Sequence, residues 1–418
     1  MSMEYTDFSP VRVAVVGGGA AGMMAAVAAA EMGASVTLFE RNDRLGKKLR
    51  ITGKGRCNVT NDCDRDAFLA NVPTNPRFLY SALAAFTTAD TKAFFESHGV
   101  PLKTERGNRV FPESDKAIDV VNAMKRAVLD VGVKIINERV TSLLLRDGCL
   151  GGVYTTRPYE FDRVIICTGG KSYPLTGSDG DGYKLAAQAG HSVTRLVPSL
   201  VPLTCKGTDC RTMQGLSLRN VGLCIKDNAT GKAVYRDFGE MMFTHFGLTG
   251  PMILSASAHL PDIAPDKYTA YIDLKPALDE KTLDARLLSD FSKYQNKDFA
   301  NSLGDLLPQK MIDVIIARSG IDPHKKVNSI TAQERRDLIA LLKGFAVSLQ
   351  GFRPIDEAIV TKGGVSISEI KPASMESRLV SGLYFAGEVL DVDAYTGGFN
   401  LQIAFSTGHL AGESAATD

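Results

Sequence analysis

A ten-residue stretch near the N-terminus, Val13–Gly22 (VAVVGGGAAG), constrains this chain more than any other. Apolar residues lead into glycines and then into alanines, which predicts a buried strand, a tight turn and the start of a helix. Gly17, Gly19 and Gly22 fill the Gly-x-Gly-x-x-Gly pattern, in which glycines allow a sharp turn, a close approach to a pyrophosphate and tight helix packing. The next strand, Ser35–Glu40, ends in an acid suited to ribose hydroxyls. We therefore expect a dinucleotide-binding α/β domain.

Length and charge limit the remaining possibilities. A chain of 418 residues predicts two or three domains, and a net charge of +1 predicts neither a nucleic-acid partner nor a membrane surface. The uncharged stretch Val13–Ala30 is about long enough to span a bilayer, but its glycines argue against a span. Seven scattered cysteines and the absence of a signal-peptide pattern indicate the cytoplasm. No C-x-x-C or H-E-x-x-H motif occurs, so we expect no metal site.

A basic loop, Arg41–Asn61, follows the ribose-binding strand directly. It contains three glycines and seven Lys or Arg residues, which makes it too irregular for a helix and too basic to bury. The loop could simply be solvated. Its position favours a second interpretation, in which Lys47 or Lys48 lies near phosphate and Gly53–Asn58, which includes Cys57, lies near the reactive ring.

Two later segments repeat the pattern of a strand that ends at small residues. Phe161–Gly170 runs into Thr168 and Gly169, and Gly382–Glu388 ends in Gly387 and an acid. Gly397 and Gly398 then open a helix expected over Leu401–Ala411, whose N-terminus offers N–H groups and a positive dipole end to an electron-rich ring edge. A flavin has such an edge. This second site predicts FAD rather than NAD as the dinucleotide.

The middle of the chain has a different sequence pattern from the two ends. Strand patterns at Val133–Ile136, Arg139–Leu145 and Gly152–Thr156 predict a small antiparallel excursion, which follows a helix over Asp115–Val131 that Ser114 could cap. From about residue 193, short strands divided by Gly and Asn predict a β domain, and a charged helical block comes after it.

These motifs together resemble a known group. The segments VVGGGAAG, FERN, GKGRCNVTN, RVFP, CTGGKSYPLTGSDGDGY, FTHFGLTGP and GLYFAGEVLDVDAYTGGFNLQIAFSTG are similar to bacterial NAD(P)/FAD-dependent oxidoreductases of the BaiN type, which include aminoacetone-oxidase-like members. The similarity extends from about Val11 to Gly412. One departure is Lys54, where the pattern has glycine.

The resemblance implies a fold and a set of cofactor residues. The fold is a Rossmann-like, glutathione-reductase-like FAD domain built from both chain ends, with an inserted β-barrel domain and a small helical domain. The expected boundaries are 1–192 with 355–418 for the FAD domain, 193–275 with 326–354 for the β domain, and 276–325 for the helical domain. The implied cofactor residues are Gly17, Gly19, Ala21 and Gly22 at the pyrophosphate, Glu40 and Arg41 at the ribose, Val140 at adenine, Thr168 and Gly169 along the cofactor, Glu388 at the ribityl or pyrophosphate region, and Asn400 and Leu401 at the flavin ring.

The catalytic residues are less constrained by pattern. His245 lies in a glycine-rich apolar loop and could act as an acid or orient a ligand, although a lone histidine is more often structural. Tyr395, with Asp393, precedes the helix expected to face the flavin and could equally be loop scaffold. Arg109 could bind a substrate carboxylate or carbonyl, or serve as a cap.

Several reactions stay open at this point. We expect an FAD-dependent oxidoreductase that acts on a small unsaturated or carbonyl substrate, with NADH or NADPH as a transient donor because no second nucleotide-binding motif occurs. The alternative is an amine or aminoketone oxidase. A dithiol reductase would need a Cys pair four residues apart after the ribose acid; Cys57 and Cys63 have the wrong spacing, and Cys205 and Cys210 lie in the wrong place. A non-enzymatic or tRNA-acting flavoprotein is a third class. The sequence leaves the oligomeric state undetermined.

Overall fold

The computed structural model describes residues 9–146 and 149–417. The chain forms two compact units. The first contains the chain up to Ser199 together with everything from Ala358 onward, and the second runs from Leu200 to Glu357. The second unit is therefore an insertion, and the first unit is assembled from both ends of the chain.

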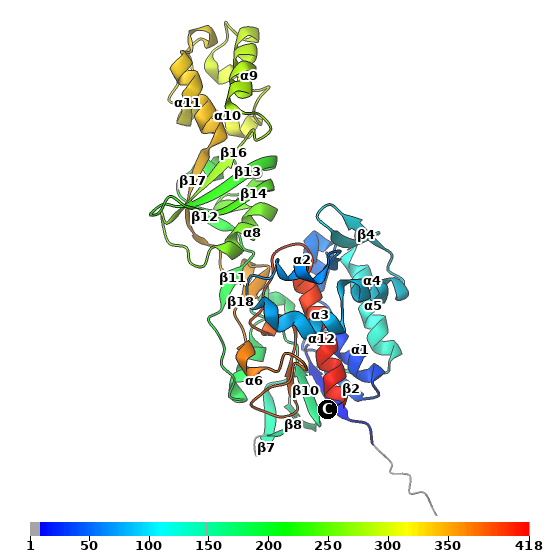
Figure 1. Cartoon of the computed structure of the whole chain (residues 1–418). Helices are drawn as coiled ribbons and strands as arrows, with labels where there is room; N and C mark the ends of the chain where they lie inside the picture. Colours follow the sequence, from blue (N-terminus) through cyan, green and yellow to red (C-terminus); the bar gives the residue numbers. More distant parts are fainter. Residues whose placement is uncertain (1–8, 147–148, 418) are drawn as a thin grey trace, which may run out of the picture. The chain divides into compact units, whose positions relative to one another are not determined.

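A parallel sheet of five strands forms the centre of the first unit (Figure 1). Its order is β19 (Leu383–Phe385), β10 (Arg163–Ile166), β1 (Arg12–Val16), β2 (Ser35–Phe39) and β6 (Lys134–Ile136). Every neighbouring pair is parallel. The strands are apolar and the central ones are almost completely buried, as expected of a parallel sheet covered on both faces. The predicted Rossmann-like α/β fold is confirmed.

Helices α1 (Ala20–Glu31) and α12 (Phe399–Thr417) pack closely against each other (Figure 1). A Cβ placed on Gly408 would lie 2.4 Å from the carbonyl oxygen of Ala21, and one on Gly412 equally close to that of Ala25. Small residues on both helices therefore let the backbones approach. The C-terminal helix is thereby held beside the glycine-rich turn at the other end of the chain.

The remaining helices and strands of this unit surround the sheet. The helices are α2 (Arg65–Leu69), α3 (Tyr80–Ala85), α4 (Thr88–Ser97), α5 (Ala117–Asp130) and α6 (Asp181–Gln188). Strands β3 (Thr60–Asn61), β5 (Arg109–Pro112) and β4 (Leu102–Glu105) form one small sheet, β7 (Ser142–Arg146), β8 (Cys149–Tyr154) and β9 (Pro158–Glu160) another, and β11 (Val197–Ser199) pairs with β18 (Val360–Lys362).

Two local expectations were wrong. Lys134–Ile136 pairs in parallel with β2 in the central sheet, so only the later strands form a separate antiparallel sheet. A strand of three residues carries too little pattern to reveal its partner. Ser114 does not cap α5. The helix has Lys116 at its N-cap because Asp115 takes a left-handed φ of 56°, and the Ser114 hydroxyl donates to Asp119 instead.

The second unit contains a closed barrel of six strands with helices appended. The barrel order is β12 (Leu203–Cys205), β15 (Gly247–Thr249), β14 (Ala233–Phe243), β13 (Ser217–Asp227), β16 (Tyr268–Asp273) and β17 (Phe345–Phe352). The helices are α7 (Asp209–Thr212), α8 (Pro251–His259), α9 (Glu280–Lys293), α10 (Gln309–Ser319) and α11 (Ala332–Lys343). One continuous apolar core includes barrel residues such as Ile225 and helix residues such as Ile315. The predicted inserted barrel is confirmed, whereas the exact domain boundaries stay a prediction.

No helix in the described ranges, 9–146 and 149–417, is both long enough and apolar enough to cross a membrane.

Candidate cofactor site

The glycine-rich turn lies between the end of β1 and the start of α1. Gly17 has a left-handed φ of 107°, and a Cβ there would lie 2.6 Å from the carbonyl oxygen of Cys167. A Cβ on Gly22 would lie 1.8 Å from the carbonyl oxygen of Gly17. In contrast, a Cβ on Gly19 would meet nothing within 4 Å. The fold therefore requires two of the three motif glycines, and the third faces open space at the helix N-terminus, where anions bind readily.

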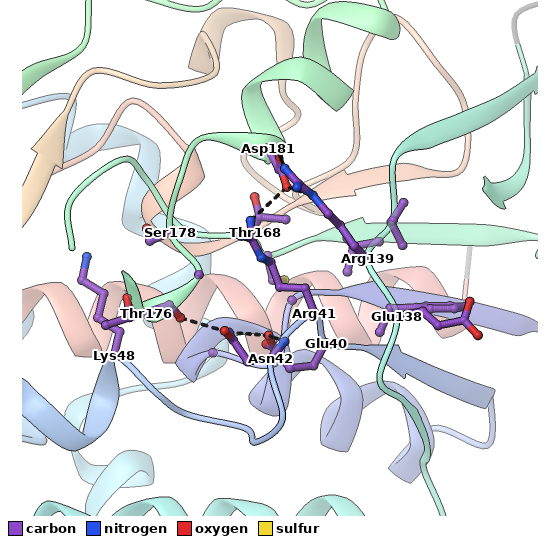
Figure 2. Close-up of a pocket in the computed structure, with 18 residues that line it drawn as sticks. Glu40, Arg41, Asn42, Lys48, Glu138, Arg139, Thr168, Thr176, Ser178 and Asp181 are labelled. Atoms are coloured by element: carbon purple, nitrogen blue, oxygen red, sulfur yellow. Dashed lines mark hydrogen bonds and ion pairs between the residues drawn. The ribbon is translucent and has the colours of Figure 1, made fainter. Parts of the chain in front are cut away.

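A pocket of about 640 Å³, including its open mouth, lies at this turn (Figure 2). Its lining comes from the carboxyl ends of β1, β2, β6 and β10, the edge at which parallel α/β sheets bind ligands. The predicted cofactor residues that line it are Gly17, Gly19, Glu40, Arg41, Lys48, Val140, Thr168 and Gly169. Residues far apart in sequence are thus brought together as the motifs indicated.

Two buried hydroxyls in the lining suit a polar ligand. Thr168 Oγ1 and Ser178 Oγ have no hydrogen-bond partner within the part of the chain that the structure describes. A buried polar atom without a partner is costly unless a ligand or water satisfies it. Together with the open space at Gly19 and the N-terminus of α1, these hydroxyls fit the diphosphate and ribose of a dinucleotide. The residues present therefore fit FAD.

Glu40 has a structural role that the sequence did not reveal. Its buried carboxylate accepts hydrogen bonds from the Gly18 N–H at 2.8 Å and from the backbone and side-chain nitrogens of Asn42 at 2.8 and 2.7 Å. The carboxylate thus ties the glycine-rich turn to the end of β2. A residue expected only at a ribose also holds the pocket in shape.

Lys48 and Glu388 form an ion pair, although the sequence suggested a separate ligand contact for each. Lys48 Nζ lies 2.7 Å from both Glu388 Oε2 and the hydroxyl of Ser172. Glu388 Oε1 accepts from the Thr361 N–H at 2.9 Å and from Ser172 at 3.0 Å. This pair connects the basic loop to the turn Gly387–Val389 that follows β19, and Lys48 also lines the pocket. Lys47 instead lies in a shallow surface groove with Arg44 and Arg50.

The end of the basic loop meets the second glycine pair. Asn61 donates to the carbonyl of Gly397 at 2.9 Å, and a Cβ on Gly398 would lie 2.3 Å from the carbonyl oxygen of Thr60. Gly53 approaches the backbone of Asn58, whose buried Oδ1 has no partner among the described residues. The loop and the start of α12 therefore form one surface, as the two-part cofactor signature predicts.

Packing accounts for several predicted residues without a ligand. Ala21 contacts Gly387, where a Cβ would lie 2.7 Å from the Ala21 methyl group. The Asn400 side-chain amide bonds to the backbone of Ala394 and Tyr395, at 2.7 to 3.3 Å, and so holds the loop before the glycine pair. Next in the chain, Leu401 is half-buried in the first turn of α12. The backbone N–H groups of Asn400 and Leu401 lie in the first turn of α12 and so have no acceptor within the helix.

Two of the three candidate catalytic residues lie in the first unit, near this surface. Arg109, in β5, pairs across the strands with Asn61, and its Nε donates to the Arg106 carbonyl at 3.0 Å. Tyr395 lies in the loop that Asn400 holds. Burial, and after it the Asp393 carboxylate, raises the pKa of Tyr395. The third candidate, His245, belongs to the second unit, where it lies between β14 and β15 with its ring 5.0 Å from that of Phe246.

Asp393 is almost completely buried beside this loop. One carboxylate oxygen accepts from the Ser199 hydroxyl at 2.9 Å, and the other has no partner within the described chain. Such an oxygen can accept a further hydrogen bond. Asp393 can therefore bind a hydrogen-bond donor in addition to holding its loop.

The cysteines near the loop are poor candidates for dithiol chemistry. Burial raises the pKa of the Cys57 thiol to about 12 and that of Cys63 to about 11. Both thiols are therefore protonated at neutral pH, whereas the thiolate is the reactive form. All seven cysteines are free thiols. Cys205 and Cys210 hydrogen-bond to each other in the second unit.

Sequence reasoning missed six polar residues of the pocket: Asn42, Glu138, Arg139, Thr176, Ser178 and Asp181. The only signal for two of them was the acid- and glycine-rich run GSDGDGY, interpreted as a helix entry. Asn42 and Arg139 each follow a strand by a few residues, and nothing in their neighbours marked them.

The comparisons with known proteins identify the family of this chain. The model of the HI0933-like protein Rossmann domain matches residues 11–414. The 3-dehydro-bile acid delta(4,6)-reductase of Clostridium scindens is 32% identical over 97% of this chain and 99% of its own length. The ribosomal RNA dihydrouridine synthase of Escherichia coli is 30% identical, over 94% of this chain and 95% of its own length.

Among solved structures, similarity is found to the 3-ketosteroid-delta4-(5alpha)-dehydrogenase of Rhodococcus jostii, with a TM-score of 0.46 and 16% identity over 100% of this chain and 99% of that one. A flavocytochrome c3 fumarate reductase gives a TM-score of 0.48 and 17% identity over 97% and 78%. From the family match over nearly its whole length, the chain belongs to the HI0933-like Rossmann-domain family and is an FAD-dependent oxidoreductase.

Proposed function

We propose that this protein reduces a carbon–carbon double bond conjugated with a carbonyl group, with NADH or NADPH as the electron donor. The observation that carries the proposal is the chemistry shared by its two named relatives. The delta(4,6) bonds of a 3-dehydro-bile acid are conjugated with the 3-oxo group, and the 5,6 bond that becomes saturated in dihydrouridine is conjugated with a ring carbonyl. Relatives with unrelated substrates thus act on the same functional group.

Bound FAD, once reduced by the nicotinamide donor, would supply a hydride to the carbon β to the carbonyl. The protein must then stabilise charge on the carbonyl oxygen and deliver one proton to the α carbon. Arg109 is suited to the first task because a guanidinium donates strong, directional hydrogen bonds. It lies beside Asn61, which contacts Gly397 of the glycine pair.

Tyr395 is suited to the second task. Burial raises its pKa, so the phenol keeps its proton at neutral pH and can act as a general acid. The amide of Asn400 fixes the backbone of the Tyr395 loop, which precedes the glycine pair directly. The net reaction would add a hydride and a proton across the double bond and release NAD(P)⁺.

The test separates the two half-reactions in an anaerobic stopped-flow instrument. We expect NADH or NADPH to bleach the flavin absorbance, and a steroid enone or a simple cyclic enone to restore it. The Tyr395→Phe variant should bleach at the wild-type rate and recover at least about a hundredfold more slowly, the lower end of the usual range of general acid catalysis. Arg109→Gln should also slow the recovery, whereas Arg106→Gln, a neighbouring exposed arginine, serves as its matched control.

No bleaching by either nicotinamide would refute the reductase and direct the search to an oxidase whose donor is an organic amine. Equal recovery rates in Tyr395→Phe and the wild type would remove Tyr395 from the mechanism.

A second candidate is the same reduction on a uracil base in RNA. Two features favour it: the dihydrouridine synthase relatives and the surplus of positive charge in the loop Arg41–Asn61, in which Arg44, Arg50 and Lys54 are exposed. The neutral net charge of the whole chain predicts the opposite. Recovery of the bleached flavin with unmodified ribosomal RNA, tested beside the enone, distinguishes the two substrates. Retention of that activity in Arg44→Gln/Arg50→Gln would argue against the loop as the RNA contact.

A further inference from the structure

We propose that four charged residues, Arg41, Arg139, Asp179 and Asp181, form a latch that must open for FAD to enter or leave its pocket. This inference rests on the binding of FAD but not on the reaction proposed above. The four residues are called the adenosine latch below. They come from three segments far apart in sequence: the ends of β2 and β6 and the entry to α6.

The latch is a connected set of ion pairs, of which Figure 2 shows Arg41, Arg139 and Asp181. Arg41 lies 2.5 Å from Asp179 and 3.2 Å from Asp181. Arg139 makes two hydrogen bonds to Asp181, at 2.6 and 2.7 Å, and lies 3.5 Å from Asp179. Each arginine therefore contacts both carboxylates, and the removal of one member leaves the others without full compensation.

Three members of the latch both line the pocket and reach the solvent. Arg41, Arg139 and Asp181 all line the pocket. Their side chains also retain solvent exposure, at 31%, 46% and 13%. Val140, the residue expected at adenine, follows Arg139 directly and lines the same pocket. The wall at the adenosine end thus consists of side chains that can separate, while the glycine-rich backbone bounds the other side.

Neutral hydrogen bonds hold the same segments together at the base of the latch. Asn137 donates to the Asn42 carbonyl at 2.8 Å, and Asn42 donates to the Thr176 carbonyl at 3.1 Å. These bonds can keep the strand ends in register while the ion pairs open. Exposed ion pairs contribute little to stability individually, so a network of them can open without unfolding the unit.

A latch makes a kinetic prediction that a ligand contact does not. If the closed latch obstructs both entry and exit, loosening it lowers one barrier for both directions. We expect Asp181→Asn and Arg139→Gln to raise the association and dissociation rates of FAD by similar factors, about five- to thirtyfold, as the loss of one or two partly exposed ion pairs implies. The dissociation constant should change much less than either rate.

The experiment follows FAD fluorescence in a stopped-flow instrument, as apoprotein takes up FAD and as holoprotein releases it on dilution. ADP, which carries only the adenosine half, should compete with faster exchange in the same variants. Lys184→Gln is the matched control, because Lys184 pairs with Asp181 at 3.0 Å from a side chain that is 73% exposed and does not line the pocket. The double variant Arg139→Gln/Asp181→Asn should exchange little faster than the faster single variant, since both changes open the same latch.

A faster dissociation with an unchanged association rate would overturn the latch, because it would mean that these residues contact FAD directly. Unchanged rates in both single variants would overturn it as well. If Asp181→Asn does not fold, Arg139→Gln alone decides, since its side chain is the most exposed of the pair. Failure of the wild-type protein to bind FAD would refute the cofactor assignment itself, which is a distinct result.

Discussion

Substitutions at two glycines of the first motif, Gly22 and Gly19, should affect folding and cofactor binding separately. In Gly22→Ala, the new methyl carbon would lie 1.8 Å from the Gly17 carbonyl oxygen and 3.2 Å from the Cys167 side chain. The helix and the turn would have to move apart by more than about 1 Å before ordinary contact distances are restored. Overpacking of this kind costs about 1–3 kcal/mol, against which alanine regains about 1 kcal/mol of helix propensity. The atom that the methyl group meets belongs to the backbone of Gly17, which cannot rotate away as a side chain can. We therefore expect the free energy of unfolding to fall by about 2 kcal/mol, near the upper end of this range.

Gly19→Ala provides the matched control. Its Cβ would meet nothing within 4 Å, and its φ of −83° suits any residue. Stability should fall by less than about 1 kcal/mol, the scale of a changed helix N-cap. The methyl group would nevertheless project into the space where the pyrophosphate is expected, so FAD affinity should fall by at least about tenfold, or about 1.4 kcal/mol.

Urea unfolding of the two apoproteins and FAD titration of each measure these effects separately. The expected pattern is a lowered midpoint for Gly22→Ala and a weakened affinity with a near wild-type midpoint for Gly19→Ala. Wild-type stability in Gly22→Ala would show that the turn and helix are looser than the structure indicates. Unchanged FAD affinity in Gly19→Ala would refute the placement of the pyrophosphate.

Three further predictions concern other parts of the first unit. The ring nitrogens of His191 lie 2.7 Å from the Ser377 hydroxyl and 3.1 Å from the Glu369 carboxylate, and burial lowers the pKa of this histidine. The folded state therefore holds His191 neutral. The free energy of unfolding should fall as the pH drops below about 6.5, by up to about 1.4 kcal/mol per pH unit. Urea midpoints at pH 7.5 and 5.5 should converge in His191→Gln, and an equal pH dependence would contradict this. Cys57, with a pKa raised to about 12, should resist iodoacetamide at pH 8 in the native protein and react on unfolding, as mass spectrometry can measure. Lys54 has a left-handed φ of 58°, so Lys54→Gly should raise the free energy of unfolding by up to about 1 kcal/mol, and a lowered urea midpoint would contradict that strain.

Short-range patterns account for the parts of the fold that were predicted correctly. The turn at Gly17 and the pairing of a strand with a helix follow from local sterics, so the sequence alone indicates them. The departure at Lys54 was also visible in the sequence, and the left-handed backbone there explains why glycine is typical of the position. The parallel pairing of Lys134–Ile136 was not visible, because a strand partner depends on residues nearly a hundred positions away.

Hydrogen-bond partners were beyond the reach of sequence for the same reason. Lys48 and Glu388 are 340 positions apart and were assigned separately to the ligand, yet they pair with each other. Asp181 and Arg139 carried no pattern that distinguishes an ion pair at a pocket from two solvated charges. By itself the sequence determined that the chain has a dinucleotide-binding turn and a second glycine-opened helix, because glycine requirements are local. Only the tertiary structure decided which charged groups meet around the pocket, because the closure of the sheet brings together strand ends that the chain keeps far apart.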